Sequence, residues 1–558
     1  MDLVEWLEVG DGEMSDSNVI RGTMLLSAAT LFSRIIGMIY MFPFTALVGT
    51  QGVALYQYAY TPYTIMLSLS TVGIPLAVSK FVSKYHTLGD YRTGRRLFKS
   101  GLLLMTLTGF VAFLALFLLA EPIARIVIDE GKEGNTIADV TLVIRVVSMA
   151  LLIVPIMSLT RGFFQGLQSM GPTAVSQVVE QIFRIVFILV SSVIIIKFMD
   201  GDEATAATFA TFGAFVGAVG GLLVVFWYYR KRKPTLDRHL AESTVDHDVS
   251  LKDMYKEIIT YALPFVVVGL AIPLYLQIDT LLINPALKSI GYDKPAYEEV
   301  FAIITGLAHK LIMIPVSLAT ALSMTIIPAI TKSFTANREG SLQNQLTQTF
   351  QILLFLTTPA AIGLAVLSEP IFRVLYPTVN QDLGSWLLMW YAPTAILFAL
   401  FSVTAAILQG INKQKFAVYS LLAGLVLKAG LTYPFVTMFE GKGSILATNI
   451  GLLTSVIITI AVIKKYTDYE FGFLSRRLLL IGIFVVIMAV ASKLAILPLE
   501  SVMPDLYLST SEGGSMLYSI INLLIGVTVG GIVFLWLSYR SNLAGLILGE
   551  RFSFLKRR

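Results

Sequence analysis

Stretches of about twenty apolar residues recur along this 558-residue chain, and they limit its folds more than any other feature. A helix needs about 20 such residues to cross a hydrocarbon core about 30 Å thick. We count fourteen of these stretches, which predict an all-α polytopic membrane protein with 14 transmembrane helices. The spans are 19–45, 53–79, 100–120, 139–160, 173–196, 204–229, 258–284, 300–328, 349–368, 384–408, 416–437, 443–463, 478–497 and 516–538.

The composition agrees with this assignment, because 56% of the residues are hydrophobic and only 14% are charged. Ordinary soluble domains contain about 25% charged residues. The chain has no cysteine, which excludes disulfides, thiolate metal sites and cysteine nucleophiles. It also lacks an HExxH motif and a phosphate-binding glycine loop. We therefore expect no enzyme activity, no metal site and no cofactor.

Two short motifs have simple structural interpretations. Gly213, Gly217 and Gly221 are spaced four residues apart within one span, which predicts close packing against another helix. The sequence DGD at 200–202 resembles a metal-binding motif of glycosyltransferases, but it falls in a short loop with no catalytic domain around it. Neither motif suggests catalysis.

The basic residues predict the orientation in the plasma membrane. With both termini in the cytoplasm, 27 of the 41 Lys and Arg residues fall in inner loops and the C-terminal tail, against seven in outer loops. This is the distribution that the positive-inside rule requires. The richest inner loops are 80–99 and 230–257, and both lie directly beside predicted spans. We interpret them as contacts with anionic membrane lipids and expect no nucleic-acid binding.

The chain contains an internal repeat. LAEPIARIV at 119–127 returns as LSEPIFRVL at 367–375, and residues 164–185 align with 408–429. Six spans per repeat give halves of parallel topology, which is typical of transporters that expose a central site alternately to each side. The predicted parts are a cytoplasmic tail (1–18), an N-lobe (19–229), a cytoplasmic linker (230–257), a C-lobe (258–463), a final helix pair (464–538) and a second cytoplasmic tail (539–558).

Four basic residues lie deep within the spans: Arg34, Arg184, Lys310 and Lys428. Each is nine or more residues from either end of its span, too far for its side chain to reach the interface. Four unpaired, lipid-facing cations would cost on the order of 10 kcal/mol. They must therefore face a hydrated cavity or find anionic partners.

Glu180 and Asp279 are the only deep acids, so the four cations leave two positive charges. That surplus suits a dianionic head group such as a pyrophosphate. Glu180 stands four residues before Arg184, so these two can also form a purely structural ion pair. For Arg34 and Lys310 we favour substrate binding over ion pairs between helices. Asp279 can bind a coupling cation, relay a proton or pair with one of the cations.

Three segments resemble the MOP exporter superfamily, most closely its SpoVB/YtgP branch. They are FSRIIG at 32–37, TVGIPLAVSKFVSKY at 71–85 and HKLIMIPVSLATALSMTIIPAITK at 309–332. This branch includes MurJ-type lipid II flippases. The resemblance implies that Arg34 and Lys310 line the transport cavity and that the final two spans form a groove for the lipid tail.

The resemblance implies a function. We expect a flippase that moves undecaprenyl-pyrophosphate-linked peptidoglycan precursor, lipid II, from the inner to the outer leaflet by alternating access. The expected partners are lipid II, anionic lipids and the cell-wall synthesis machinery. Coupling to the membrane potential or to a cation stays open. The alternatives are a Wzx-like flippase for another lipid-linked oligosaccharide, a MATE-type drug exporter and a membrane enzyme that polymerises the precursor.

Overall fold

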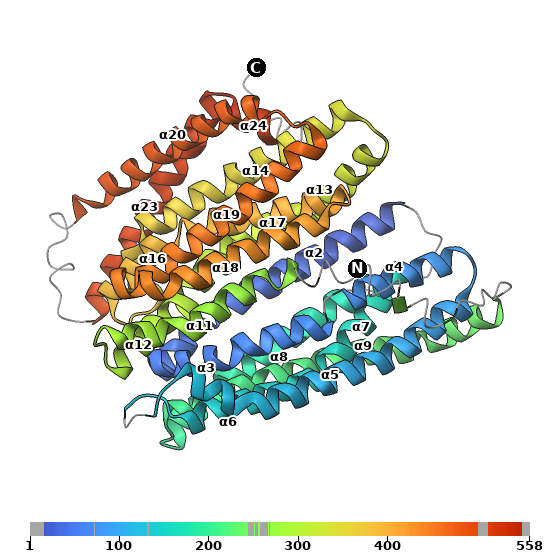
Figure 1. The fold of residues 1–558 in the computed structure, drawn as a ribbon, viewed down its shortest axis with the longest axis horizontal. Helices are drawn as coiled ribbons and strands as arrows, with labels where there is room; N and C mark the ends of the chain where they lie inside the picture. The colour runs from blue at the N-terminus through green and yellow to red at the C-terminus, as the bar shows by residue number, and fades with distance from the viewer. Residues whose placement is uncertain are drawn as a thin grey trace. The chain divides into compact units, whose positions relative to one another are not determined.

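The computed structural model describes residues 16–71, 73–130, 133–243, 250, 255–256, 266, 268–499 and 512–548. Every element of regular secondary structure in these residues is helical, which confirms the predicted all-α class (Figure 1). The chain divides into two compact units, residues 1–281 and 282–558, which we call the N-unit and the C-unit. Each unit is described by itself.

The N-unit is built from long helices that pack in pairs. Helix α8 packs along α9, α2 packs on α8, α3 contacts both α6 and α9, and α4 contacts α5 and α7. The elements are α2 (Asp16–Ile39), α3 (Met41–Thr71), α4 (Ile74–Thr87), α5 (Tyr91–Val127), α6 (Ile137–Ser148), η1 (Met149–Leu152), α7 (Val154–Gly166), α8 (Gly171–Val193), η2 (Ile194–Phe198), α9 (Glu203–Ala241) and the first part of α11 (Ala271–Ser289).

The C-unit follows a similar plan and then adds the final helix pair. Helix α18 packs along α19, α13 contacts α14 and α17, and α20 packs on both α14 and α23. After α11 the elements are α12 (Lys294–Ala302), η3 (Ile303–Ala308), α13 (His309–Thr335), α14 (Glu339–Val366), α15 (Ser368–Leu375), α16 (Gln381–Tyr391), α17 (Thr394–Gly410), α18 (Gln414–Phe439), α19 (Gly441–Thr467), α20 (Phe471–Ile496), α23 (Glu512–Arg540) and α24 (Leu543–Leu548).

Among the described residues, 12 helical stretches are long and apolar enough to cross a membrane, against the fourteen predicted. One stretch, Met24–Thr87, contains the predicted span 53–79 and most of the predicted span 19–45. The predicted span 258–284 lies mostly outside the described residues. The multi-pass architecture is confirmed, and the count of fourteen stays a prediction.

The predicted first span, 19–45, contains a break that periodicity did not reveal. Helix α2 ends at Ile39, Tyr40 forms a turn, and α3 bends sharply at Gly49, where φ is 63° and ψ is −173°. A residue with a side chain is strained at such a positive φ, whereas glycine adopts it at little cost. A methyl group at position 49 would also lie only 3.2 Å from the Glu203 carboxylate.

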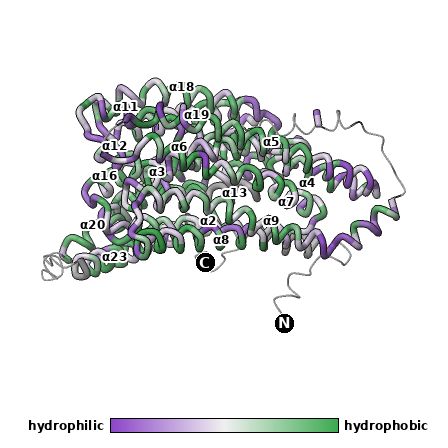
Figure 2. The backbone as a smooth tube through the Cα atoms, turned by 90° about the horizontal axis from the view of Figure 1, so that it is seen from below, coloured by the Kyte–Doolittle hydropathy of each residue, from purple (hydrophilic) through white to green (hydrophobic). Residues whose placement is uncertain are grey.

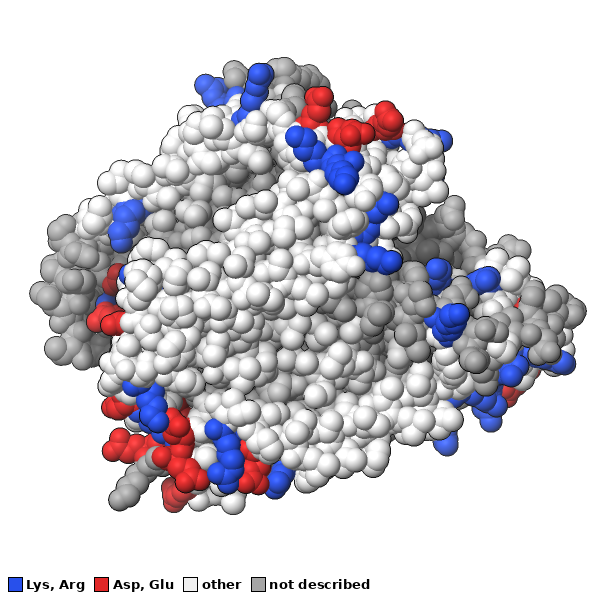
Figure 3. Space-filling model, viewed as in Figure 1, with Lys and Arg blue, Asp and Glu red and all other residues white. Residues whose placement is uncertain are grey.

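Charged side chains concentrate toward the helix ends. Figure 2 shows green, hydrophobic backbone along the middle of the long helices and purple segments toward their ends. On the face seen in Figure 3, Lys, Arg, Asp and Glu gather at the margins, and the surface between them is almost entirely white among the described residues. An uncharged band bordered by charged ends is the surface that a lipid bilayer requires.

The loop motif DGD starts helix α9 and has a structural role. The Asp202 side chain accepts a hydrogen bond from the backbone N–H of Thr205 at 2.8 Å, which caps the helix. The pKa of the Asp202 carboxyl lies below its usual range, because the hydroxyl and the backbone N–H of Thr205 both donate hydrogen bonds to it. The role that the structure shows for this motif is to cap a helix.

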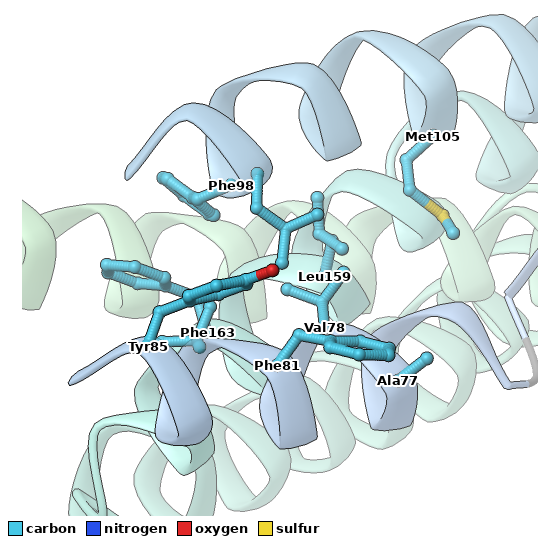
Figure 4. Close-up of a cluster of buried hydrophobic side chains, with 10 residues drawn as sticks. Ala77, Val78, Phe81, Tyr85, Phe98, Met105, Leu159 and Phe163 are labelled. Atoms are coloured by element: carbon cyan, nitrogen blue, oxygen red, sulfur yellow. The ribbon is translucent and has the colours of Figure 1, made fainter. Parts of the chain in front are cut away.

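One end of the N-unit is fixed by a cluster of buried apolar side chains from α4, α5 and α7 (Figure 4). The rings of Phe98 and Phe163 stack with centroids 4.1 Å apart. The cluster joins α4 and α5, which follow each other in the chain, to the more distant α7. Its buried members are Ala77, Val78, Phe81, Val82, Tyr85, Leu97, Phe98, Met105, Leu159 and Phe163.

The structure reproduces the predicted repeat at the turns before α8 and α18. Gln168 and Asn412, which are 244 residues apart, both adopt positive φ, 59° and 58°. The backbone N–H groups of each turn donate to the same positions: Gln168 to Gln165 and Asn412 to Gln409. The two turns share one conformation at the predicted offset, which agrees with the repeat, although the turns at Asn337 and Asn542 adopt the same conformation.

The second pair of matching segments gives the same result. Arg125 forms an ion pair with Glu121 at 2.9 Å, and Arg373 forms one with Glu369 at 3.1 Å. Each pair spans four residues of a helix, and the two pairs are 248 residues apart. The Glu and the Arg that both copies of this segment share thus form one local ion pair in each unit.

Candidate anion-binding site

In the N-unit, Glu180 on α8 lies between two arginines. Its Oε1 accepts from Nη2 of Arg184 at 2.8 Å, and its Oε2 accepts from Nη2 of Arg161 at 3.0 Å. The three side chains are only 12–15% exposed. The predicted pair between Glu180 and Arg184 is therefore present, and Arg161 of α7 is a third member that the sequence analysis placed in a loop.

Hydrogen bonds fix Arg161 more firmly than a single ion pair would. Its Nε and Nη2 donate to the Ser176 hydroxyl at 3.0 and 2.6 Å. That hydroxyl donates in turn to the carbonyl of Gly221 on α9 at 2.8 Å. One chain of hydrogen bonds thus connects α7, α8 and α9, and it holds both guanidinium groups against the Glu180 carboxylate.

The glycine stripe of α9 lies directly against this cluster. A methyl group at Gly217 would come within 2.7 Å of the Glu180 carbonyl and 2.9 Å of Arg184 Cβ. One at Gly221 would come within 3.0 Å of Arg161 Nη2. The predicted packing role of the stripe is confirmed. The absence of side chains lets α9 approach the charged face of α8 at van der Waals distance.

On its other side Arg184 faces a group of tyrosines from α3. The guanidinium is within electrostatic range of the hydroxyls of Tyr56, Tyr60 and Tyr63. The Nε of Arg184 and the hydroxyl of Tyr63 are both buried without a hydrogen-bond partner in the structure. The Tyr56 and Tyr60 rings stack with centroids 5.3 Å apart. Among the described residues, Nε of Arg184 and the hydroxyl of Tyr63 therefore provide two unused donors beside this ring stack.

Arg34 lies on α2, whose neighbour is α8. The Thr30 hydroxyl donates to Gln177 Oε1 at 3.0 Å, and a methyl group at Gly37 would meet Gln181 Nε2 at 2.7 Å. Arg34 is four residues after Thr30 and three before Gly37, so it belongs to the same side of the helix. Its side chain is exposed. The structure thus brings Arg34 and Arg184 onto two helices that pack together.

Arg161 adds a positive charge that the sequence analysis did not count. On α2, α7 and α8, Arg34, Arg161 and Arg184 contribute three positive charges and Glu180 one negative charge, which leaves two. A polar region with two surplus positive charges attracts an anion more strongly than one with a single charge.

In the C-unit, Lys310 and Lys428 both lie within electrostatic range of the His309 ring. Lys428 on α18 is completely buried, whereas Lys310 on α13 is partly exposed. The Nδ1 of His309 is 3.0 Å from the Tyr391 hydroxyl. The structure therefore brings the two predicted lysines into one neighbourhood, next to a buried His–Tyr pair that the sequence analysis did not predict.

Asp279 is buried on α11, at 2% exposure. Among the described residues, no group of three or more His, Cys, Asp or Glu side chains is placed to hold a metal ion. The roles considered for Asp279, which were cation coupling, proton relay and ion pairing, stay predictions. The same holds for substrate contact by the four basic residues.

Arg161, which the sequence analysis did not select, could have been identified from its position in the sequence. It lies five residues before Gly166, where α7 ends, and Glu180 follows the same short turn on α8. Antiparallel helices joined by a short turn bring residues on either side of that turn together. A search for opposite charges across the turn would have paired Arg161 with Glu180.

Comparison with known families gives two matches. The family described as "Polysaccharide biosynthesis protein" matches residues 19–334, which is more than half of the chain. The family described as "MatE" matches residues 302–433. The two matches together reach from the first helices of the N-unit to α18 of the C-unit.

Among curated proteins, "Lipid II flippase MurJ" of Bacillus subtilis (strain 168) is 45% identical over 96% of this chain and 97% of its own length. "Stage V sporulation protein B" of the same organism is 24% identical over 81% of this chain and 85% of its own length.

Among solved structures, "Lipid II flippase MurJ, inward closed conformation" aligns with a TM-score of 0.64 at 16% identity, over 93% of this chain and all of that one. An inward-facing MATE family transporter of the MOP superfamily aligns with a TM-score of 0.63 at 15% identity, over 79% of this chain and 96% of its own.

Proposed function

The chain belongs to the polysaccharide biosynthesis protein family of the MOP superfamily, together with the MurJ lipid II flippases, and from this premise we propose that it flips lipid II. Its substrate is the undecaprenyl-pyrophosphate-linked peptidoglycan precursor, which it moves from the inner to the outer leaflet of the plasma membrane. The observation that carries the proposal is the 45% identity to a lipid II flippase over 96% of this chain. Identity at that level over nearly full length extends through both units and the final helix pair.

The deep basic residues support a role in binding the pyrophosphate. Arg34 and Arg184 in the N-unit and Lys310 and Lys428 in the C-unit are the proposed contacts. A dianion leaves water at great cost unless guanidinium or ammonium groups replace its hydration shell. Arg34 is exposed and has no acid one turn away on its helix, so we assign it the first contact.

Alternating access is the proposed transport cycle. The N-unit and the C-unit would move against each other, and the linker 230–257 would connect them in the cytoplasm. Like charges in an empty site repel each other by about 1 to 4 kcal/mol per close pair, depending on hydration, so a bound pyrophosphate favours closure. The final pair, α20 and α23, would hold the polyprenyl tail outside the site.

The proposed energy source is the membrane potential. A potential that is negative inside draws an empty, positively charged site back toward the cytoplasm, by about 2.3 kcal/mol per charge per 100 mV if the full field is crossed. No cofactor takes part, and Asp279 is the proposed residue for coupling to a cation. The chain acts as a carrier without enzymatic activity, in association with the cell-wall synthesis machinery.

A second candidate is a flippase for another lipid-linked oligosaccharide, which the description of the matched family favours. Both candidates share the pyrophosphate, so the deep cations do not separate them. A MATE-type exporter of cationic drugs is less suitable, because Arg34, Lys310 and Lys428 would repel such cargo. The likeness to MATE structures, at 15% identity, concerns the fold alone.

Depletion in cells tests this function. A strain lacking all its lipid II flippases receives this chain, and lipid II on the outer leaflet is measured with a membrane-impermeant probe. We expect growth and outer-leaflet lipid II to return. Lipid II that stays in the inner leaflet, despite normal insertion of the chain into the membrane, would contradict the proposal. Restored export of a different polymer alone would favour the second candidate.

A further inference from the structure

A lysine of the C-unit lies inside a cage of three aromatic rings. The Nζ of Lys442, in the first turn of α19, is 5.3 Å from the centroid of Trp390, 5.4 Å from Trp386 and 5.9 Å from Phe439. We call these four residues the Lys442 cage. Cations are attracted to ring faces within about 6 Å, so the rings hold the ammonium in place.

The backbone around the cage fixes this position. A methyl group at Gly441 would lie 2.8 Å from Val300 Cγ1 and 3.1 Å from Leu387 Cδ2. One at Gly443 would lie 2.1 Å from the carbonyl oxygen of Phe435. Both glycines therefore let the start of α19 press against its neighbours. Lys442, between them, is placed beside α16 by the fold and not by a flexible loop.

The charge of Lys442 is left without an anion. Among the described residues, its side chain forms no ion pair and no hydrogen bond. Glu440, the adjacent acid, accepts a hydrogen bond from the Tyr292 hydroxyl instead. Aromatic rings attract an ammonium but do not neutralise it, and its N–H donors stay available.

The cage lies at a boundary of the membrane. Helix α18 ends at Phe439 and α19 begins at Gly441, so their turn falls between two predicted spans. Trp and Tyr are enriched at this depth, where head groups begin. The side chains around the cage are apolar and exposed: Met389, Trp390, Met438 and Phe439.

The repeat shows that the fold does not require this cage. At the offset of 244 residues, Leu142 and Val146 correspond to Trp386 and Trp390. The corresponding turn of the N-unit, between α8 and α9, therefore has a lysine, Lys197, but no tryptophan at the positions of the two cage rings. A feature that only one copy of the repeat carries calls for a local role.

We propose that the Lys442 cage is a docking surface for the head group of an anionic phospholipid. The ammonium donates hydrogen bonds to the phosphodiester oxygens, and the exposed apolar side chains contact the first carbons of the acyl chains. A zwitterionic lipid carries its own cation beside the phosphate and so competes less well. With the cytoplasmic termini that the basic residues predict, this surface belongs to the outer leaflet. It does not depend on the transported cargo.

The chain's lack of cysteine permits a local test. Met438→Cys, at an exposed position, carries a single fluorophore, and the full-length protein is placed in lipid nanodiscs. Phosphatidylglycerol or phosphatidylcholine with a spin label near the carbonyl then quenches the fluorophore. We expect a preference for phosphatidylglycerol of about fivefold, which corresponds to ~1 kcal/mol for one lysine near a membrane surface.

Three variants identify the cause of the preference. Lys442→Met should abolish it, Lys442→Arg should retain it, and Trp386→Leu with Trp390→Leu should weaken it. The matched control is Lys413→Met, because Lys413 lies against the single ring of Tyr466 at the opposite end of α18 and should leave the preference intact. Equal quenching by both lipids, or an unchanged preference in Lys442→Met, would overturn the proposal. So would quenching by polyprenyl phosphate alone.

Discussion

At the scale of residues, Glu180 shares its carboxylate between Arg161 and Arg184, so this group of three side chains keeps one positive charge. The sequence predicted the pair four residues apart, since helical spacing alone brings those side chains together. It did not predict Arg161, because that contact depends on how α7 and α8 turn toward each other. Spacing within one helix is readable from sequence, whereas spacing between helices needs the packed structure.

The first prediction concerns the removal of the shared carboxylate. Glu180→Gln leaves two partly buried guanidinium groups without a counter-charge, which should cost about 3–5 kcal/mol of unfolding free energy. Arg184→Met should cost less, because Glu180 keeps Arg161. The double variant should be more stable than Glu180→Gln alone, since it leaves only one unpaired arginine. Thermal unfolding in detergent measures all three. A double variant less stable than Glu180→Gln would indicate that Arg184 has a further partner.

The second prediction separates substrate contacts from structural cations. Arg34→Ala and Lys310→Ala should insert normally but fail to restore growth in a flippase-depleted strain, because the site loses charge for the pyrophosphate. Lys493→Ala is the control, since Lys493 is exposed near the end of α20. Growth is measured with membrane abundance. Normal growth of both site variants would remove Arg34 and Lys310 from the proposed site.

At the scale of elements, two devices place the charged face of α8: the glycine stripe of α9 and the cap that starts that helix. Gly217 touches α8 at the level of Glu180, and Asp202 fixes where α9 begins. Both devices were visible in the sequence as the spacing of small residues and as an acid before an apolar run. The sequence did not show which helix the glycine stripe contacts, because any neighbouring helix can pack against a stripe of glycines.

The third prediction tests the stripe. Gly217→Ala places a methyl group 2.7 Å from a backbone oxygen of α8, and backbone cannot move aside easily. Such overpacking should destabilise the protein by about 1–3 kcal/mol. Gly531→Ala in α23 is the control, because a methyl group there meets no atom within 4 Å. It should be neutral or slightly stabilising. Equal unfolding temperatures for the two variants would contradict close packing of α9 on α8.

The fourth prediction is a pH dependence of the α9 cap. Because the folded pKa of Asp202 is below its ordinary value, its contribution is present above the unfolded pKa and is lost as pH falls through the folded one. Asp202→Ala should cost about 1 kcal/mol at pH 7 and progressively less below about pH 4. Asp202→Asn keeps the capping acceptor without the charge and should cost less. If the stability lost in Asp202→Ala is the same at every pH, the charge of Asp202 does not contribute to the cap.

At the scale of the whole molecule, the repeat was predicted from two short sequence matches, and the structure has similar turns and similar ion pairs at the matching positions. The repeat could be recognised in the sequence because each copy needs the same residues for the same local geometry. The bend at Gly49 and the break at Tyr40 were not predicted, since hydropathy averages over a window and passes across single residues. The all-α class and the position of nearly every long helix followed from span length alone.

The central claim, that this chain carries lipid II across a bilayer, has one direct test. The purified protein is reconstituted into liposomes that contain lipid II with a fluorophore on its head group, and a membrane-impermeant reagent bleaches whatever is exposed outside. Liposomes without protein should keep about half of the fluorescence, because the inner leaflet is protected and lipid II does not cross unaided. With the protein, nearly all fluorescence should be lost, whereas Arg34→Ala should resemble the empty liposomes. Protection of half the lipid II in the presence of the folded, unaltered protein would contradict the account.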